Sequence, residues 1–342
     1  MRRWWHRWLI FPPELRRLGV IGLNQRNGIY LLPNNNRRFY RKVDDKLVTK
    51  TLALEMDLAV PELYHVFRTQ RSLKKISAAL EGRDSFVLKP SRGSGGRGIL
   101  VIKSRRGNKF VKASGVVMTE AEIERHASEI LGGMFSLGGN RDVAMVEAFV
   151  NCHEAVAKVS YQGAPDVRVI MLHGYPVMAM LRVATRQSDG KANLHRGAIG
   201  IGVDLATGIT IHAVHHGSPV VKHPDLDTSL VGQQIPDWDK VLAIASRGYE
   251  MTGLGYLGAD LIIDEHRGPV VIELNARPGL AIQLANGTGL RHRFEKVKTH
   301  KINFPNESWE KRVAFSVKSF AHSPQHIHEL QEVAEKIDEG IV

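Results

Sequence analysis

The sequence of 342 residues is poor in cysteine and contains no long apolar stretch. Its single cysteine, Cys152, excludes an internal disulfide framework and favours a reducing compartment. No apolar stretch reaches the roughly 18 residues that a membrane-spanning helix needs. The N-terminus also lacks the apolar core and the small-residue cleavage site of a secretory signal. We therefore expect a cytoplasmic globular protein with two or three subdomains.

Acidic residues are scarce in the first 50 positions, where twelve Lys and Arg face only Glu14, Asp44 and Asp45. This segment supplies +9 of the net charge of +12, so the rest of the chain is close to neutral. Because the excess is confined to one end and no nucleic-acid-binding motif accompanies it, we do not expect a nucleic acid as a partner. Residues 1–11 (MRRWWHRWLIF) either make weak contact with an anionic membrane surface or pack on the protein body or a second subunit. We favour packing.

Residues 255–279 predict a β-hairpin that presents oxygen ligands. Strands over 257–264 and 270–274 flank a short polar turn, with Asp260 in the first strand and Glu273 and Asn275 at the end of the second. Residues i and i+2 of a strand point to one face, and the turn brings Asp260 close to them. Two carboxylates and an amide oxygen form a hard site that suits Mg²⁺ or Mn²⁺ bridged to phosphates. The alternative is a pair of solvent-facing acids on an antiparallel ladder.

A glycine-rich loop lies between two predicted strands, over 86–88 and 99–102. The loop, residues 91–98 (SRGSGGRG), has four glycines in six positions, which leave backbone N–H groups free to approach a phosphate chain. Lys89, at the end of the first strand, adds a positive charge. This is neither a Walker nor a Rossmann loop, because no Gly-Lys-Ser/Thr follows and a strand comes next. On its own, such a loop is more often a plain turn.

The remaining pattern alternates helices and strands. Helices are predicted over 44–58, with an Asp N-cap, over 119–131, with Thr119 and Glu122 as a capping box, and over 236–252 and 325–338. Strands are predicted over 144–150, 166–171 and 176–183, the last two joined by a turn at Gly174-Tyr175. The polar loop 193–197 carries Arg196, a planar cation suited to carboxylate or phosphate. After Gly289 the chain is expected to be basic and irregular up to the last helix.

In their order and spacing these blocks resemble the ATP-grasp superfamily, and within it the RimK-type glutamate ligases and alpha-L-glutamate ligase-like proteins. The resemblance covers residues 44–289. It rests on Asp-Lys-Leu at a helix start, Val-Leu-Lys-Pro before the glycine-rich loop, and a strand with Glu147 followed by Glu154. Asp-Val-Arg, Asn-Leu-His-Arg-Gly and Asp260…Glu273-x-Asn275 complete it.

The resemblance implies a role for each matching residue. Lys46 and Lys89 hold the ATP phosphates, and the loop with Ser91, Gly93, Ser94, Gly95 and Gly96 closes over them. Glu147, Phe149 and Val150 form the hinge strand that binds adenine, and Glu154 binds the ribose hydroxyls. Asp260, Glu273 and Asn275 bind two Mg²⁺ or Mn²⁺ ions. Arg168 and Arg196 bind phosphate or carboxylate and, with Lys89, form the catalytic set.

The implied fold class is α+β, with two α/β subdomains that hold ATP between them. We expect a basic, tryptophan-rich segment over 1–43, a small subdomain over 44–146, a C-terminal subdomain over 147–290 and a basic tail over 291–342. Relatives carry a complete domain of ~100 residues before the Asp-Lys-Leu helix, whereas 43 residues precede it here. That domain helps to select the substrate, so glutamate as a substrate does not follow. The tail either covers the site or forms a contact in a homo-oligomer.

The implied activity is ATP-dependent ligation of a carboxylate to an amine through an acylphosphate, on an amino acid, a peptide or a protein acceptor. Lysines, loop N–H groups and the metal share the phosphate charge, and no residue stands out as general base. Two alternatives remain. One keeps the ATP site but ends at phosphoryl transfer, and the other is a nucleic-acid- or membrane-binding protein with an inert site.

Overall fold

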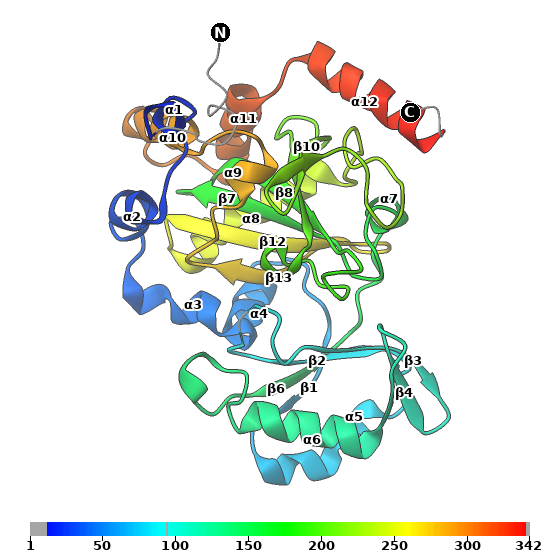
Figure 1. Ribbon diagram of the computed structural model, residues 1–342. Coiled ribbons are helices and arrows are strands. Elements are labelled where there is room, and N and C mark those ends of the chain that lie inside the picture. The colour runs from blue at the N-terminus through cyan, green and yellow to red at the C-terminus, as the bar shows by residue number, and fades with distance from the viewer. Residues whose placement is uncertain (1–11, 94, 340–342) are drawn as a thin grey trace.

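The computed structural model describes residues 12–93 and 95–339, so the expectations for residues 1–11 and for Ser94 fall outside it. The described chain forms two antiparallel sheets, each packed with helices, which confirms the expected α+β class. In Figure 1 the smaller sheet lies below the larger one. Within the same ranges no helix is long and apolar enough to cross a membrane.

The smaller sheet has six strands in the order β1-β6-β2-β3-β4-β5. Their bounds are Leu63–Phe67, Ala144–Glu147, Phe86–Pro90, Leu100–Arg106, Lys109–Lys112 and Val117–Thr119. The 3₁₀ segment η4 (Gln70–Lys75) and the helices α5 (Ile76–Leu80) and α6 (Glu120–Leu131) pack on it, and α6 starts at the predicted capping box. Its core is built from residues between Phe67 and Val146. The strand expected over 144–150 is β6, and it ends at Glu147, close to the larger domain.

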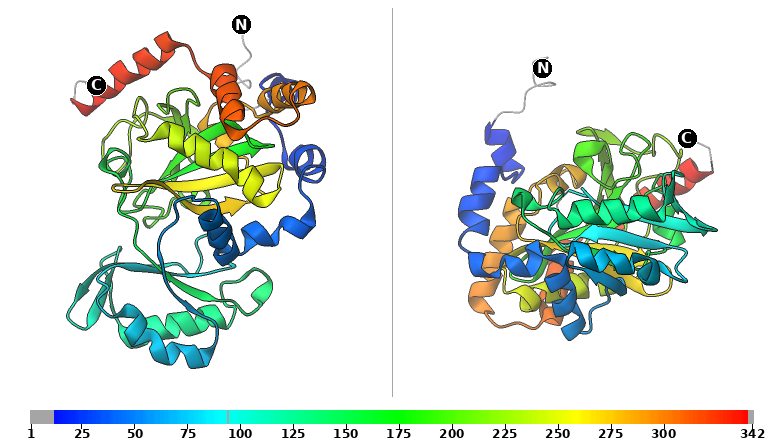
Figure 2. Two further views of the ribbon diagram at one scale, coloured as in Figure 1. Left: turned by 180° about the vertical axis from the view of Figure 1, so that it is seen from behind. Right: turned by 90° about the horizontal axis from the view of Figure 1, so that it is seen from below.

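The larger sheet has seven strands in the order β11-β10-β9-β8-β7-β12-β13. Their bounds are Ser218–Val220, Thr210–His215, Ile199–Val203, Tyr175–Val183, Asp166–Leu172, Tyr256–Asp264 and Gly268–Asn275. Helix α8 (Trp238–Thr252) packs on β12, β13, β7 and β8, and α11 (Trp309–Phe320) packs on β8 and α8. Helix α9 (Ile282–Ala285) lies against β8, β9 and β10 on the opposite face (Figures 1 and 2).

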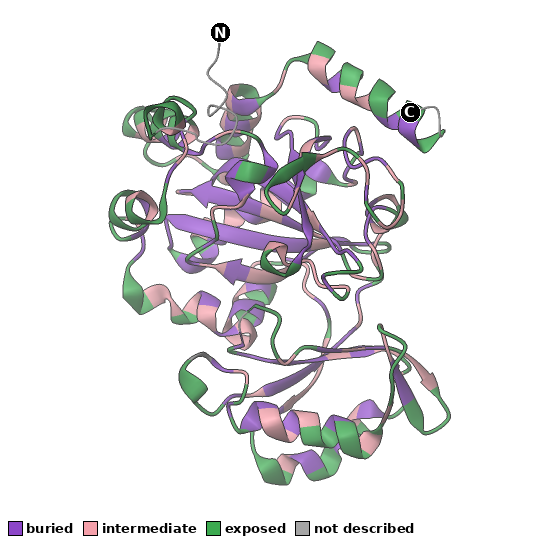
Figure 3. Cartoon of the chain, in the orientation of Figure 1, coloured by how far each residue is buried: buried purple, intermediate pink, exposed green. Residues whose placement is uncertain are grey.

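Helix α8 covers one face of strand β12, and the other face is available for a site. Leu257 points toward α8, where it lies 3.1 Å from the position of a Cβ on Gly248. Because side chains alternate along a strand, Asp260 points to the face that α8 leaves free. Figure 3 shows β12 buried along nearly its whole length, and Asp260 itself is buried.

The first and last segments that the structure describes pack on the larger domain. Ile21, Tyr30, Val43 and Ala53 join its core, so the first segment belongs to it, with α2 (Leu23–Gln25), η2 (Arg26–Leu31), η3 (Arg37–Phe39), α3 (Arg41–Asp44) and α4 (Lys46–Glu55). Helix α1 (Pro12–Arg17) buries no residue, and the chain directly after it is bonded to the same domain by the Gly289 N–H, which donates to Leu18 O. The expectation of an irregular chain after Gly289 is wrong, because α10 (Arg291–Asn303) and α11 are regular helices. Helix α12 (Pro324–Asp338) confirms the last predicted helix. Short helical segments η5 (Leu137–Gly139), α7 (Glu154–Ala157) and η6 (Leu194–Arg196) complete the fold.

Candidate active site

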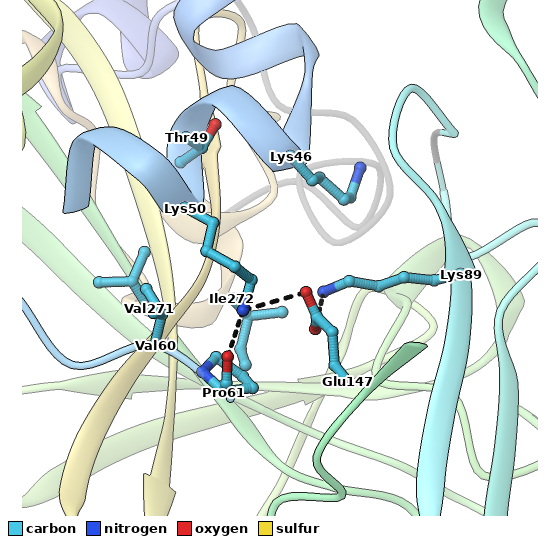
Figure 4. Close-up of a pocket in the computed structure, with 9 residues that line it drawn as sticks. All are labelled: Lys46, Thr49, Lys50, Val60, Pro61, Lys89, Glu147, Val271 and Ile272. Carbon is cyan, nitrogen blue, oxygen red and sulfur yellow. Dashed lines mark hydrogen bonds and ion pairs between the residues drawn. The ribbon is translucent and has the colours of Figure 1, made fainter. Parts of the chain in front are cut away.

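Two lysines converge on the buried carboxylate of Glu147, at the end of β6 (Figure 4). Lys89 Nζ lies 2.7 Å from Glu147 Oε2, and Lys50 Nζ lies 3.0 Å from Oε1. Lys50 also donates a hydrogen bond to the carbonyl of Pro61. Glu147 is held from both sides because Lys89 comes from the neighbouring strand β2, while Lys50 reaches across from α4 of the larger domain.

A third lysine, Lys46, stands one helical turn before Lys50 and so lies on the same side of α4. Its ammonium donates to the carbonyl of Gly93 at 2.7 Å and lies 3.6 Å from Glu273 Oε2. The side chains of Lys46, Lys50, Lys89 and Glu147, with Val60, Pro61 and the β13 residues Val271 and Ile272, line one narrow pocket between the two domains. Its free volume is about 10 Å³, roughly enough for one water molecule.

The electrostatics of this cluster favour an anion. Burial alone would raise the pKa of Glu147, but Lys89 and Lys50 bring it below its ordinary value, so the carboxylate is charged. Burial lowers the pKa of Lys50, and Glu147 offsets part of that effect. Three ammonium groups share the carboxylates of Glu147 and Glu273, which leaves a positive excess where α4, β2 and β13 meet.

Asp260 is the centre of a second cluster, on β7, β8 and β12. It pairs across the ladder with Arg168, whose Nε donates to Oδ1 at 2.7 Å. Arg182 Nη2 donates to Oδ2 at 2.9 Å, and its Nε pairs with Asp166 on the adjacent strand. Although burial would raise the pKa of Asp260, Arg168 and Arg182 hold it at about 2. Asp260 is therefore ionised and fixed in position.

The hairpin places the three expected oxygen ligands together. Glu273 lies directly opposite Asp260 in the β12–β13 ladder, and Asn275 Nδ2 donates to Asp260 Oδ2 at 3.2 Å. A register shift directly after Asp260 marks the point at which this ladder is irregular. The hairpin thus brings Asp260 close to Glu273 and Asn275, as the strand pattern predicts, and their role as metal ligands stays a prediction.

The start of the glycine-rich loop is tied to α4. Ser91 is fully buried; its hydroxyl donates to Asp45 and accepts from the Leu47 N–H at 3.2 Å. The Lys46 N–H donates to the Ser91 carbonyl at 2.8 Å. A Cβ on Gly93 would collide with Pro90, whereas Gly95 and Gly96 have φ of 62° and 72° and open space around them. The loop is thus anchored at its base and glycine-dependent at its tip.

Comparison with known proteins decides the family of this chain. The model of the family described as "Sugar-transfer associated ATP-grasp" matches residues 25–299. This protein belongs to that ATP-grasp family. It is also 29% identical over 196 residues to a "Probable alpha-L-glutamate ligase" from Thioalkalivibrio sulfidiphilus (strain HL-EbGR7), which covers 57% of this chain and 48% of the other. The match therefore spans about half the length of that relative.

Solved structures with a similar chain path include two synthetases. D-alanyl-alanine synthetase A from Vibrio cholerae overlaps with a TM-score of 0.46 at 13% identity, over 79% of this chain and 68% of the other. The D-cycloserine synthetase DcsG overlaps with a TM-score of 0.44 at 14% identity, over 78% of this chain and 73% of the other. These similarities concern the chain path alone and do not indicate a substrate.

The remaining predicted residues of this ATP-grasp protein are Phe149, Val150, Glu154 and Arg196. Val150 is buried and Phe149 half-buried in the segment that leaves β6. Glu154 is exposed as the first residue of α7, and the preceding His153 caps that helix through Nδ1. Arg196 is exposed in η6, where Asn193 accepts the His195 N–H at 3.0 Å. The structure does not bring Arg196 into contact with Asp260 or with the lysines of the pocket.

The donor set at the sheet edge fits a hard divalent cation. Within the described residues no three His, Cys, Asp or Glu side chains form a metal cluster. The set here is two carboxylates and the amide of Asn275, which is the few-ligand arrangement that Mg²⁺ uses when phosphates supply the other oxygens. Asp260 is ionised and Glu273 lies beside it, 3.6 Å from Lys46 Nζ, so these two carboxylates would supply the charge of such a site.

Two residues of the site, Lys50 and Arg182, were not predicted. Lys50 follows Lys46 by four positions on a helix, and this spacing alone places both on one face. Arg182 lies opposite Asp166 in the β7–β8 hairpin. The predicted turn at Gly174-Tyr175 is one residue late, since Leu172 pairs with Tyr175 around His173-Gly174. A register shift between Ile170 and Met171 then moves the ladder by one residue and brings Asp166 opposite Arg182.

Proposed function

We propose that this protein is an ATP-dependent carboxylate–amine ligase that forms an amide bond through an acylphosphate. The observation that best supports the proposal is the arrangement of Lys46 between the glycine-rich loop and Glu273: its ammonium lies 2.7 Å from the Gly93 carbonyl and 3.6 Å from Glu273 Oε2. A triphosphate that enters between the loop and the Asp260–Glu273 edge meets a lysine, loop N–H groups and two carboxylates for its cation.

The proposed division of labour follows the two clusters. Lys46 and Lys89 neutralise phosphate oxygens, and the loop over residues 91–98 closes on them, since glycines leave its backbone N–H groups accessible. Phe149, Val150 and Glu154 hold adenine and ribose. Lys50 and Lys89 fix the charged Glu147 at the base of the nucleotide site.

The second cluster serves the reacting groups. Asp260, Glu273 and Asn275 would hold Mg²⁺ or Mn²⁺, which neutralises charge on the β- and γ-phosphates when bound. Arg182 and Arg168 fix Asp260, and Arg168 also offers a planar cation at this edge to the anionic reactant. Arg196, in an exposed loop, is free to approach a carboxylate or the departing phosphate.

The carboxylate of the substrate attacks the γ-phosphorus, the bond from this phosphorus to the bridging oxygen breaks, and ADP leaves. The amine then attacks the acyl carbon of the acylphosphate, loses a proton to solvent or buffer, and displaces inorganic phosphate. The chain contributes position and charge neutralisation, which suffice because a phosphoryl group needs little covalent assistance. The proposed substrates are an amino acid as the carboxylate and an amino acid, peptide or protein as the amine.

Mass spectrometry of the products tests this proposal. The protein is incubated with Mg-ATP and a panel of amino acids and short peptides, beside a Glu273→Gln variant and a matched Glu265→Gln variant. Glu265 lies exposed in the turn at the far end of the same hairpin. The expected result is a condensation product with ADP in the wild type and in Glu265→Gln, and none in Glu273→Gln. A phosphorylated acceptor without an amide would support the phosphotransferase alternative, and failure to bind Mg-ATP would support an inert site.

A further inference from the structure

The helices α1, α2, η2 and α10 form one layer along one flank of the larger domain (Figures 1 and 2). The Gly289 N–H donates to Leu18 O at 3.0 Å and the Arg291 N–H to Gly19 O at 2.9 Å, which fastens α1 to the start of α10. Tyr30 of η2 packs on Phe294 of α10 with ring centroids 4.4 Å apart. Both orientations in Figure 2 show these helices side by side at one edge of the molecule. We call their outer surface the α1–α10 face, residues 12–32 and 291–304.

The α1–α10 face exposes large apolar side chains that the core does not use. Leu23 is 61%, Leu32 56% and Ile29 46% exposed on the α2–η2 turns, whereas Tyr30 and Leu31 of the same turns are buried. Of the fourteen large apolar side chains exposed in the described residues, six lie on this face: Leu18, Leu23, Ile29, Leu32, Ile302 and Phe304. Several exposed large apolar side chains on two adjacent segments, 12–32 and 291–304, are typical of an interaction surface.

Cationic groups surround these apolar positions. Residues 12–32 and 291–304 hold eight Lys and Arg against two acids, Glu14 and Glu295, and one of the eight, Arg293, points inward and donates to the Val177 carbonyl at 2.8 Å. Glu295 is already engaged, because it accepts a hydrogen bond from Tyr30 and lies 3.4 Å from Lys298 Nζ. Arg16, Arg17 and Arg291 are exposed next to Leu18, at the junction of α1 and α10. The face therefore combines exposed leucine and isoleucine with unneutralised arginine.

This combination matches the surface of an anionic bilayer. Interfacial segments insert apolar side chains at the headgroup boundary and place Lys and Arg at its phosphates. The eleven residues that precede α1 continue the same composition, with three Trp and three Arg. A second copy of this chain fits less well, because two such faces would bring like charges together.

We propose that the α1–α10 face docks this enzyme on an anionic lipid surface. Docking there leaves the smaller domain free to move over the nucleotide site, since the face lies on the larger domain alone. The proposal does not depend on the reaction that the site performs.

Vesicle co-sedimentation of the full chain tests the proposal. The vesicles are phosphatidylcholine alone or phosphatidylcholine with phosphatidylglycerol at 7:3. The key variant replaces Leu23, Ile29 and Leu32 by Ser. The matched control replaces Val117, Met134 and Val221, which are equally exposed elsewhere, by Ser. A charge variant carries Arg16→Glu and Arg17→Glu, and a deletion removes residues 2–11.

We expect salt-sensitive binding to the anionic vesicles only, reduced by about tenfold or more in the key variant and in the charge variant and unchanged in the control. Circular dichroism and nucleotide binding verify that each variant is folded. Equal binding by the key variant and the wild type would overturn the proposal, as would loss of binding only in the deletion. No vesicle binding together with a change of oligomeric state in the key variant would assign the face to a second copy instead.

Discussion

Lys89 Nζ lies 2.7 Å from Glu147 Oε2, in a pair whose side chains are both less than a tenth exposed. The other oxygen of the same carboxylate takes Lys50 from α4, so Glu147 joins the two domains through charge. The resemblance to ATP-grasp ligases assigns Glu147 to adenine binding. Its geometry here adds a second role as the counter-ion that keeps two buried lysines in place.

Glu147→Gln should destabilise the fold by about 3 kcal/mol, because it leaves two buried ammonium groups without their carboxylate. The free energy of unfolding from urea titration measures this effect. Glu154→Gln is the matched control, since Glu154 is exposed, and should change stability by less than about 0.5 kcal/mol. A Glu147→Gln variant of wild-type stability that only loses affinity for ATP would show that the lysines do not need this charge.

Asp260 and Glu273 should respond differently to loss of charge although they face each other in the ladder. Asp260→Asn leaves Arg168 and Arg182 short of a counter-charge in the interior, which should cost about 3 kcal/mol of stability. Glu273→Gln, at a half-buried position, should stay within about 0.5 kcal/mol of the wild type. The same Glu273→Gln variant should raise the Mg²⁺ concentration needed for half-maximal ATP binding by about tenfold or more. Unchanged Mg²⁺ dependence would remove Glu273 from the ligand set.

Ser91→Ala tests whether Ser91 supports the loop or contacts phosphate. Its hydroxyl is engaged by Asp45 and the Leu47 N–H, so we expect a stability loss of about 1–2 kcal/mol and a change in the KM for ATP below about threefold. Ser246→Ala, equally buried on α8 and bonded to the Gly174 carbonyl at 2.6 Å, should lose similar stability with no effect on ATP. A large rise in KM at full stability would mean that Ser91 binds phosphate directly.

Stability should fall on mild acidification because of His173. Burial, with Lys301 and Lys298 nearby, lowers the pKa of His173 to about 4. In the unfolded chain this histidine binds a proton near pH 6.5, whereas in the folded chain it stays neutral down to about pH 4. The contribution of His173 to stability is therefore complete above pH 6.5 and is lost as the pH falls toward 4. His173 has a φ of 52° in the β7–β8 turn, a conformation that Asn accepts. His173→Asn should therefore reduce the loss of stability between pH 7 and 4.5 by roughly 1–2 kcal/mol. Urea titrations of both proteins between pH 7 and 4.5 measure this effect. The prediction is contradicted if the free energy of unfolding falls with pH equally in the variant and in the wild type.

Much of the fold could be predicted because its local signals agree. Thr119 and Glu122 form the predicted capping box of α6, and Asp45 caps α4 as expected. The hairpin 256–275 appears within one or two residues of its predicted strands. Helix α10 was missed because only Phe294 and Val297 are buried along its thirteen residues, so it lacks a clear apolar face.

The site was harder to predict where it depends on long-range pairing. Arg168 meets Asp260 only because β7 pairs with β12, a contact between residues 92 positions apart that no local pattern encodes. The i, i+4 spacing of Lys46 and Lys50 was visible in the sequence, but the apolar positions of the same helix were the stronger pattern. Contact between Lys50 and Glu147 needs both domains in place.

The transfer of ¹⁸O tests the proposed ligase most directly. A mixture of amino acids labelled with ¹⁸O in their carboxylates is incubated with the protein and Mg-ATP, and the inorganic phosphate released is analysed by mass spectrometry. An acylphosphate route leaves one carboxylate oxygen on each phosphate released, so labelled phosphate should form at the rate of ADP and be absent with Glu273→Gln. ADP formed together with unlabelled phosphate, or with label retained in full by the acids, would contradict the proposed reaction.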